Sequence, residues 1–216
     1  MASDELLQLR DCCVTFGEKI VLSGITLALS RNDFFILTGP NGGGKTTILR
    51  LMAGLLTPTS GKIIRTAVLT GYLPQYRHID RQFPITVEQT VLSGLNNRKS
   101  IWQPFKTKHR EMAEKAMDMM QIGGLAKKPI DSLSGGQWQK TLIARALASS
   151  PDILLLDEPE THLDIESKRH LYSVLENLRS SMAIVLVSHE SGIVNEISNK
   201  RIYKVEQTLT PVDETE

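Results

Sequence analysis

The chain has 216 residues, 41% of them hydrophobic, which suits one large domain or a core domain that carries an inserted subdomain. Its 25 basic and 24 acidic residues nearly cancel, so the overall charge does not indicate affinity for nucleic acid or for an anionic membrane surface. The start is acidic, unlike a signal peptide, and no apolar run reaches the roughly 20 residues that span a bilayer, so we expect a cytoplasmic protein.

The N-terminal part of the chain predicts two long strands joined by a tight turn, in an antiparallel β subdomain. Residues Leu6 to Phe16 and Ile20 to Leu29 are rich in β-branched and apolar side chains, and the turn between them contains Gly17. Cys12 and Cys13 are the two cysteines, and neighbouring side chains on a strand point to opposite faces. We therefore expect packing thiols in a reducing compartment, not a disulfide or a zinc site.

A glycine-rich loop follows the next strand candidate, Phe34 to Thr38. In the P-loop pattern, glycines let backbone N–H groups turn toward phosphate oxygens, and the matching residues here are Gly39, Pro40, Asn41, Gly42, Gly43, Gly44, Lys45, Thr46 and Thr47. A helix from Lys45 to Leu55 would place its N-terminal donors and its dipole at the phosphates. We expect Lys45 to contact the β- and γ-phosphates and Thr46 to ligate Mg²⁺.

The chain changes character after a further strand candidate, Val68 to Leu73. Residues 76–149 are enriched in Met, Lys, Glu and Gln and predict a helical subdomain inserted into a nucleotide-binding core of residues 1–75 and 150–205. The last residues, 206–216, are polar, and we expect a frayed tail.

Several features inside the predicted helical subdomain have plain structural interpretations. Thr86 is a candidate N-cap after the turn at Phe83 and Pro84. The short basic runs 106–110 and 127–128 favour solvated helix faces over a nucleic-acid patch. Four methionines at helical spacing favour adaptable packing over metal binding, namely Met112, Met117, Met119 and Met120.

Two fully apolar runs, Ile153 to Leu156 and Ala183 to Val187, are typical of strands covered by helices on both faces. We expect helices at about 136–149 and 165–179. Together with the P-loop these runs predict an α/β core, a mostly parallel sheet with helices on both faces.

Two carboxylates follow the first of these runs. Asp157 is predicted to hold Mg²⁺, and Glu158 is the better candidate for the general base that polarises the attacking water. A strand that ends at an N-cap acid would give the same local pattern. The P-loop earlier in the chain favours the catalytic interpretation.

The sequence Leu133-Ser134-Gly135-Gly136-Gln137 matches the ABC signature, and it precedes the Asp157 strand at the spacing that this family uses. Over nearly its whole length the chain resembles an ABC nucleotide-binding subunit. Ser134 and the glycine N–H groups at a helix start would form a second anion receptor. The resemblance implies that Ser134, Gly135, Gly136 and Gln137 contact ATP held by the P-loop of a second subunit, in a head-to-tail homodimer.

The resemblance assigns further roles. Phe16 corresponds to the aromatic residue that stacks on adenine, although an aromatic at a strand end is more often a core residue. Gln75 resembles the glutamine that contacts Mg²⁺ and the nucleophilic water, and His189 resembles the switch histidine at the γ-phosphate. The chain departs from the family pattern at Glu160, where transporters often carry a small or apolar residue, and after the signature at Trp138, for which we expect packing, and at Lys140.

The resemblance also implies partners. These are a multi-spanning permease, which would hold the chain at the inner face of the membrane, and an extracytoplasmic metal-binding protein. Residues 71–75, 83–87 and 91–95, together with Gly42 to Gly44, are similar to ATPases of zinc, manganese and iron uptake systems. A soluble ABC ATPase that acts on ribosomes or DNA is the alternative. Such proteins usually carry two cassettes or long coiled coils, and this chain has one cassette and no sustained heptads.

Overall fold

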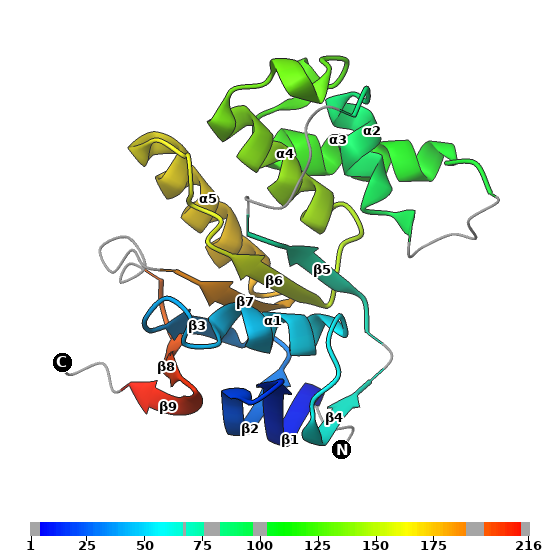
Figure 1. Cartoon of the computed structure of the whole chain (residues 1–216). Coiled ribbons are helices and arrows are strands. Elements are labelled where there is room, and N and C mark those ends of the chain that lie inside the picture. Colours follow the sequence, from blue (N-terminus) through cyan, green and yellow to red (C-terminus); the bar gives the residue numbers. More distant parts are fainter. Residues whose placement is uncertain (1–4, 67, 76–82, 97–102, 189–196, 213–216) are drawn as a thin grey trace.

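A helical lobe stands on one side of a central sheet, and a small antiparallel sheet lies on the other (Figure 1). The computed structural model describes residues 5–66, 68–75, 83–96, 103–188 and 197–212. No helix within these ranges is long and apolar enough to cross a membrane.

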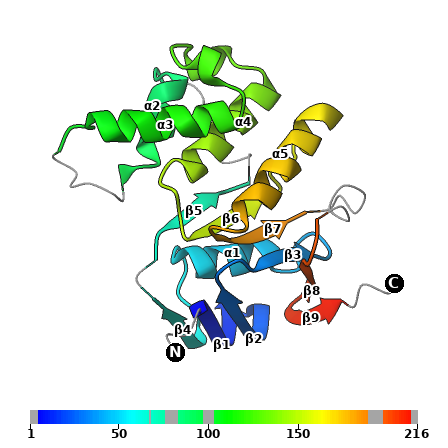
Figure 2. The same ribbon diagram turned by 180° about the vertical axis from the view of Figure 1, so that it is seen from behind.

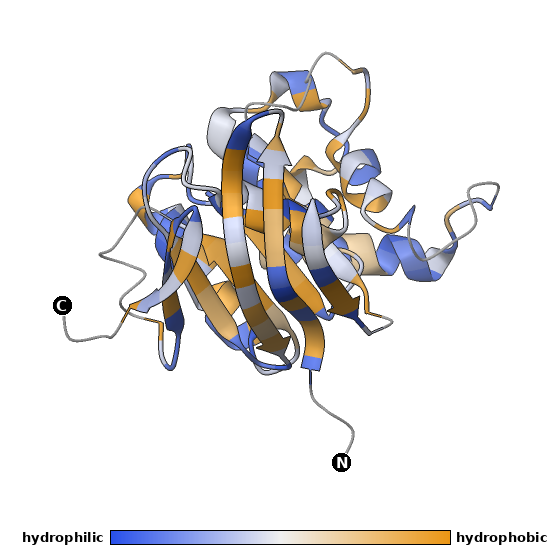
Figure 3. Ribbon diagram, turned by 60° about the horizontal axis from the view of Figure 1, so that its bottom comes forward, coloured by the Kyte–Doolittle hydropathy of each residue, from blue (hydrophilic) through white to orange (hydrophobic). Residues whose placement is uncertain are grey.

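The antiparallel sheet contains the predicted hairpin. Strands β1 (Glu5–Phe16) and β2 (Lys19–Ser30) pair along their length, and β4 (Ser60–Arg65) adds to the other side of β1 (Figure 3). The sequence did not predict β4, because its side chains are mostly exposed. Gly61 allows the close pairing, since a Cβ at this position would lie 2.2 Å from the Asp11 carbonyl oxygen.

The central sheet has the strand order β5-β6-β7-β3-β8-β9. Neighbouring strands are parallel except for the antiparallel pair at one edge, which confirms the predicted mostly parallel α/β core. The strands are β3 (Phe34–Thr38), β5 (Thr70–Leu73), β6 (Ile153–Asp157), β7 (Ala183–Val187), β8 (Arg201–Glu206) and β9 (Thr208–Val212).

The prediction of a frayed tail was wrong for Thr208–Val212, which form β9. The turn before this strand is anchored by backbone hydrogen bonds. The Gln207 N–H donates to the Gly43 carbonyl at 3.0 Å, and the Gln207 carbonyl accepts from the Ser23 N–H at 2.8 Å. These bonds use main-chain atoms, so the polar side chains of the segment gave no sign of them.

Alternate residues of the central strands enter two separate cores. In β6, Leu154 and Leu156 pack with the helical lobe and with α5 (Ile165–Leu178), whereas Ile153 and Leu155 pack with α1 (Lys45–Ala53) and the antiparallel sheet. The β6 strand is therefore buried on both faces, as its uninterrupted apolar run predicted.

The helical lobe contains α2 (Val87–Ser93), α3 (Thr107–Met119) and α4 (Gly135–Leu147), with short 3₁₀ turns at Gly123–Leu125 and Ile130–Ser132 (Figure 2). Thr86 caps α2 in a capping box with Gln89, as predicted. The proposed start of the lobe, at residue 76, lies outside the described residues.

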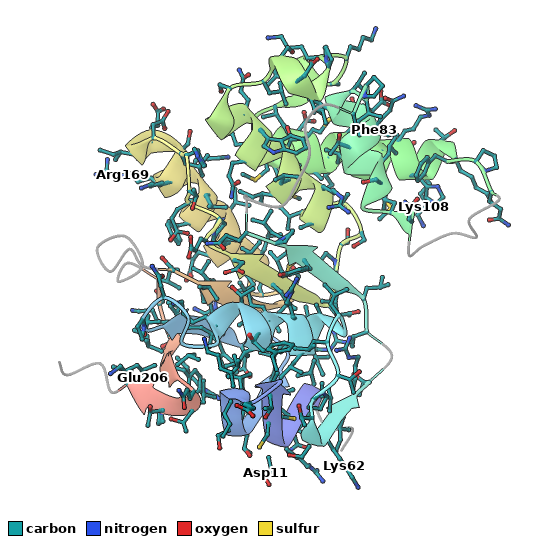
Figure 4. The ribbon with its side chains drawn as sticks, viewed as in Figure 1. Asp11, Lys62, Phe83, Lys108, Arg169 and Glu206 are labelled. Carbon is teal, nitrogen blue, oxygen red and sulfur yellow. The ribbon has the colours of Figure 1, made fainter. Side chains whose placement is uncertain are left out.

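Packing inside the lobe confirms the predicted packing role for three of the four methionines and for the tryptophan. Met117 and Met120 are buried in the core, Met112 packs against it, and Trp138 is 1% exposed. On the surface, the guanidinium of Arg110 pairs with Glu88 at 2.9 Å, and Lys108 points away from the lobe (Figure 4). Cys12 is a buried free thiol on β1.

Candidate functional site

The glycine-rich loop forms a tight turn between β3 and α1. Gly39 and Gly44 have φ angles of 124° and 107°, which side chains rarely allow. A Cβ at Gly39 would lie 2.3 Å from the Val205 carbonyl oxygen, and one at Gly44 would lie 2.4 Å from Leu22. The loop is therefore held against β8 and β2 at these two glycines, and α1 begins at Lys45 directly behind it.

Lys45 is 6% exposed and bends back over the loop. Its Nζ donates to the carbonyl oxygens of Gly39 at 2.8 Å and Pro40 at 2.9 Å. Burial lowers the pKa of this ammonium group, against the opposing effect of the Glu158 and Asp157 charges. Main-chain acceptors thus hold the Lys45 ammonium group at the loop, in a position where it would contact a bound phosphate.

Asp157, at the carboxyl end of β6, is 1% exposed. Its Oδ2 accepts a 2.7 Å hydrogen bond from Thr46 Oγ1, and its Oδ1 has no hydrogen-bond partner among the described residues. Burial raises the pKa of this carboxyl group, and the bond from Thr46 partly opposes that shift. A buried, unpartnered carboxylate oxygen beside a hydroxyl is a donor set that suits Mg²⁺, so the site fits the predicted ion.

Glu158 and Gln75 come together across the ends of neighbouring strands β6 and β5. Gln75 Nε2 donates to Glu158 Oε2 at 3.1 Å. Glu158 has a φ of 51°, a left-handed conformation that costs roughly 1–2 kcal/mol for a residue with a Cβ. Its N–H donates to the Val187 carbonyl at 3.0 Å, which helps to hold this conformation.

Lys45, Thr46, Gln75 and Glu158 line one cavity of about 570 Å³ over the P-loop, and Asp157 lies behind its wall, bonded to Thr46. Its wall contains P-loop residues, Phe16, Gln75 and Glu158, and also Lys19 and Val21 of β2, which sequence reasoning missed. Phe16 is 54% exposed at the end of β1, so it is not a core residue. Lys19 begins β2 directly after the hairpin turn that begins at Phe16, and this closeness to Phe16 in the sequence could have indicated its place in the wall.

The signature residues lie elsewhere on the chain. Ser134 is exposed at the N-cap of α4, where its Oγ accepts from the Gln137 N–H at 3.2 Å and the Gln137 side chain accepts from the Ser134 N–H at the same distance. Gly135 and Gly136 pack against His162 in the loop after β6. These four predicted ATP ligands are not part of the P-loop cavity wall of the same chain.

His189 lies outside the described residues, so its predicted role stays a prediction. The residue before it, Ser188, directly follows β7, is 2% exposed and donates a hydrogen bond to Glu160.

A second cavity, also of about 570 Å³, separates α1 from the helical lobe. Arg50 of α1 and Arg145 of α4 line it, and no carboxylate of the described residues does. Arg145 Nε donates to Ser93 Oγ at 2.9 Å, and burial lowers the pKa of its guanidinium group. Tyr72 lines the same cavity, and burial raises its pKa to about 12. Nearby on the lobe, Phe83 is 65% exposed (Figure 4).

Comparison with known proteins matches residues 22–161 to the ABC transporter family. A zinc import ATP-binding protein ZnuC of Histophilus somni is 36% identical over 198 residues, which cover 90% of this chain and 71% of that protein. The ZnuC of Haemophilus influenzae is 38% identical over 192 residues, which cover 88% and 68%.

Solved structures agree on the fold. An inward-facing structure assigned to the metal-chelate type of ABC transporters has a TM-score of 0.85 and 29% identity, over 97% of this chain and 83% of that chain. The dimeric structure of the bacterial ABC transporter cassette MJ0796 has a TM-score of 0.82 at 24% identity, over 94% and 96%.

Proposed function

The chain belongs to the ABC transporter family, as an ATP-binding subunit that hydrolyses ATP, and we propose that it drives the movement of a metal ion through a membrane permease. The relatives named as zinc import proteins, similar over about nine tenths of this chain, support a metal ion as the cargo. In this proposal the permease holds the subunit at the inner face of the membrane, and a metal-binding protein outside the membrane delivers the ion to the permease.

The proposed chemistry is transfer of the γ-phosphoryl group of ATP to water. The P-loop N–H groups and Lys45 bind the phosphates, and Phe16 stacks on the adenine ring at the open side of the cavity. Thr46, Asp157 and Gln75 would hold Mg²⁺, which neutralises phosphate charge when bound. Glu158 accepts the proton of the attacking water, and Gln75 orients Glu158 and that water.

The observation that carries this proposal is the Gln75–Glu158 hydrogen bond in the wall of the P-loop cavity. It brings an amide and a carboxylate from two strand ends to the place where a water could be held and deprotonated. Losing a positioned base lowers a rate by about 10²–10⁴. We therefore expect Glu158→Gln to bind ATP normally and to lower kcat by about that factor.

The test is ATP hydrolysis by the full chain together with a direct measurement of ATP affinity. The control variant is Glu166→Gln, which removes an acidic charge from the exposed first turn of α5 and should hydrolyse ATP at the normal rate. Turnover near the normal rate in Glu158→Gln would exclude Glu158 as the base.

We further propose that hydrolysis needs a second copy of the chain. Ser134 is exposed and lies outside the P-loop cavity of its own subunit. A capped helix start with free glycine N–H groups suits an anion. In a head-to-tail dimer, Ser134, Gly135, Gly136 and Gln137 would contact the γ-phosphate bound by the partner, with His189 as a further contact from the subunit that holds the P-loop.

The second cavity is our candidate for the permease surface. It is bordered by the strand that leads to Gln75, so a segment docked there would lie close to the proposed catalytic pair. Its two arginines and the absence of a carboxylate among its described lining residues favour a docking segment with an acidic side chain.

A further inference from the structure

Glu160 is a buried carboxylate that the proposed mechanism does not use. It is 5% exposed and follows Glu158 by two residues. Ser188 Oγ donates to Glu160 Oε1 at 2.6 Å, and Tyr172 of α5 places its hydroxyl 3.5 Å from the same Ser188 oxygen. Burying a carboxylate is unfavourable unless it gains strong hydrogen bonds. Packing alone does not require a carboxylate here, because an apolar side chain could fill the same space. What the carboxylate adds is the hydrogen bond to Ser188.

The Glu160–Ser188 bond connects the chain after β6 to the end of β7, and a backbone hydrogen bond from Glu158 connects the same two segments. The Glu158 N–H donates to Val187, the residue before Ser188, while Glu160 accepts from Ser188 itself. A third link comes from the signature helix α4, where Gln139 Nε2 donates to the Pro159 carbonyl at 2.9 Å. The three residues that begin with Glu158 are therefore held at consecutive positions.

These hydrogen bonds surround a residue with an unfavourable backbone conformation. Glu158 has a φ of 51°, and a left-handed conformation in a residue with a Cβ persists only where its surroundings hold it. The Glu158–Val187 hydrogen bond ties the main chain at Glu158 to the end of β7. A second hydrogen bond two residues later, from Ser188 to Glu160, restrains how far the end of β6 can move from the end of β7.

We propose that Glu160 is a positioning residue for ATP hydrolysis. By binding Ser188, its carboxylate keeps the ends of β6 and β7 together and so keeps the Glu158 carboxylate at Gln75. The same bond sets where the chain leaves β7, directly before His189. This role rests on the proposed role of Glu158 as the base.

The test is a double-mutant cycle with Glu160→Ala and Ser188→Ala, in which the full chain is assayed for kcat and for the KM of ATP. We expect each single variant to lower kcat about tenfold and to change KM less than about twofold. The double variant should be no slower than the slower single variant, because both remove the same bond. Glu160→Gln keeps an acceptor oxygen of the same reach and should recover most of kcat.

Two controls separate positioning from a general loss of stability. Thr90→Val removes another buried hydroxyl bond, in α2, and should match the loss of thermal stability without the loss of kcat. Glu158→Gln is measured beside the cycle. If Glu158→Gln retains turnover, the proposed base is wrong, and the role of Glu160 falls with it.

The inference alone is overturned if Glu158→Gln stops turnover and Glu160→Ala keeps the normal kcat. It is also overturned if the two single effects multiply in the double variant, or if Glu160→Gln is as slow as Glu160→Ala.

Discussion

Replacing Asp157 by Asn should stabilise the metal-free chain and abolish its use of Mg²⁺. The Asp157 carboxylate is buried, and Oδ1 has no hydrogen-bond partner among the described residues. Asn keeps a carbonyl oxygen that can accept the hydrogen bond from Thr46, so the main change is the loss of a buried charge.

The sign follows from the direction of the pKa shift. Burial raises the pKa of Asp157 above its ordinary value of 3.8, so between that value and the folded pKa the folded chain binds more protons than the unfolded chain. The free energy of unfolding therefore falls as the pH rises through this window, and the full penalty is present at neutral pH. Below the ordinary value both states are protonated and the penalty disappears.

We expect Asp157→Asn to have a higher free energy of unfolding than the unaltered chain at pH 7, because it removes the penalty of the buried charge, which Lys45 and Arg50 offset only in part. For a chain of this size, 1 kcal/mol raises Tm by about 2–4 °C. The assay is thermal unfolding with a metal chelator from pH 4 to pH 8. The exposed carboxylate Asp131 gives the control variant Asp131→Asn, with an expected change below 1 °C.

A second measurement links this stability change to function. Mg²⁺ with ATP should raise the Tm of the unaltered chain more than ATP with a chelator does, and this difference should vanish in Asp157→Asn. The reasoning is refuted if Asp157→Asn is equal to or less stable than the unaltered chain at pH 7, or if its gain stays constant down to pH 4.

Three further substitutions test the proposed contacts. Lys45→Ala should weaken ATP binding by at least about tenfold, or about 1.4 kcal/mol, in a calorimetric titration, and unchanged affinity would contradict the phosphate assignment. Ser134→Arg should lower ATP hydrolysis by at least about tenfold while a single chain still binds ATP, because Ser134 lies outside its own P-loop cavity; full activity would refute the shared site. Arg145→Glu should reduce the stimulation of hydrolysis by the permease and leave the basal rate within about twofold, and equal stimulation would exclude Arg145 from the docking surface.

The sequence predicted those parts of the fold whose signal lies in side chains of one segment. Ile153–Leu156 and Ala183–Val187 are uninterrupted apolar runs, and both lie in strands that are buried on two faces. The Phe34–Thr38 run, followed by its glycine-rich loop, gave the position of β3 and the start of α1. In each case burial of the side chains and the local backbone preference agree, so a short window of sequence is enough.

Elements held by main-chain bonds could not be predicted in this way. β4 pairs with β1 through exposed residues, and β9 depends on backbone bonds that anchor Gln207 to the P-loop and to β2. The same limit applies to the site. The motif indicated Glu158 but not its left-handed backbone. Its hydrogen bond to Gln75 joins residues 83 positions apart, which no short window of sequence reveals. The contact of Glu160 with Ser188 spans 28 residues and had no local signal.

The groups gathered at the P-loop share one energetic property. Asp157 is a buried carboxyl group whose Oδ1 has no hydrogen-bond partner among the described residues, burial lowers the pKa of Lys45, and Glu158 has a strained backbone. Each of these features destabilises the free chain. A bound nucleotide with Mg²⁺ would supply a cation for Asp157 and phosphate charge for Lys45. Binding would therefore remove part of the penalty of these buried charges, so a bound nucleotide should stabilise this region more than the rest of the fold. Hydrogen exchange should then slow most at the ends of β6 and β7, where the proposed base and the Glu160–Ser188 bond meet.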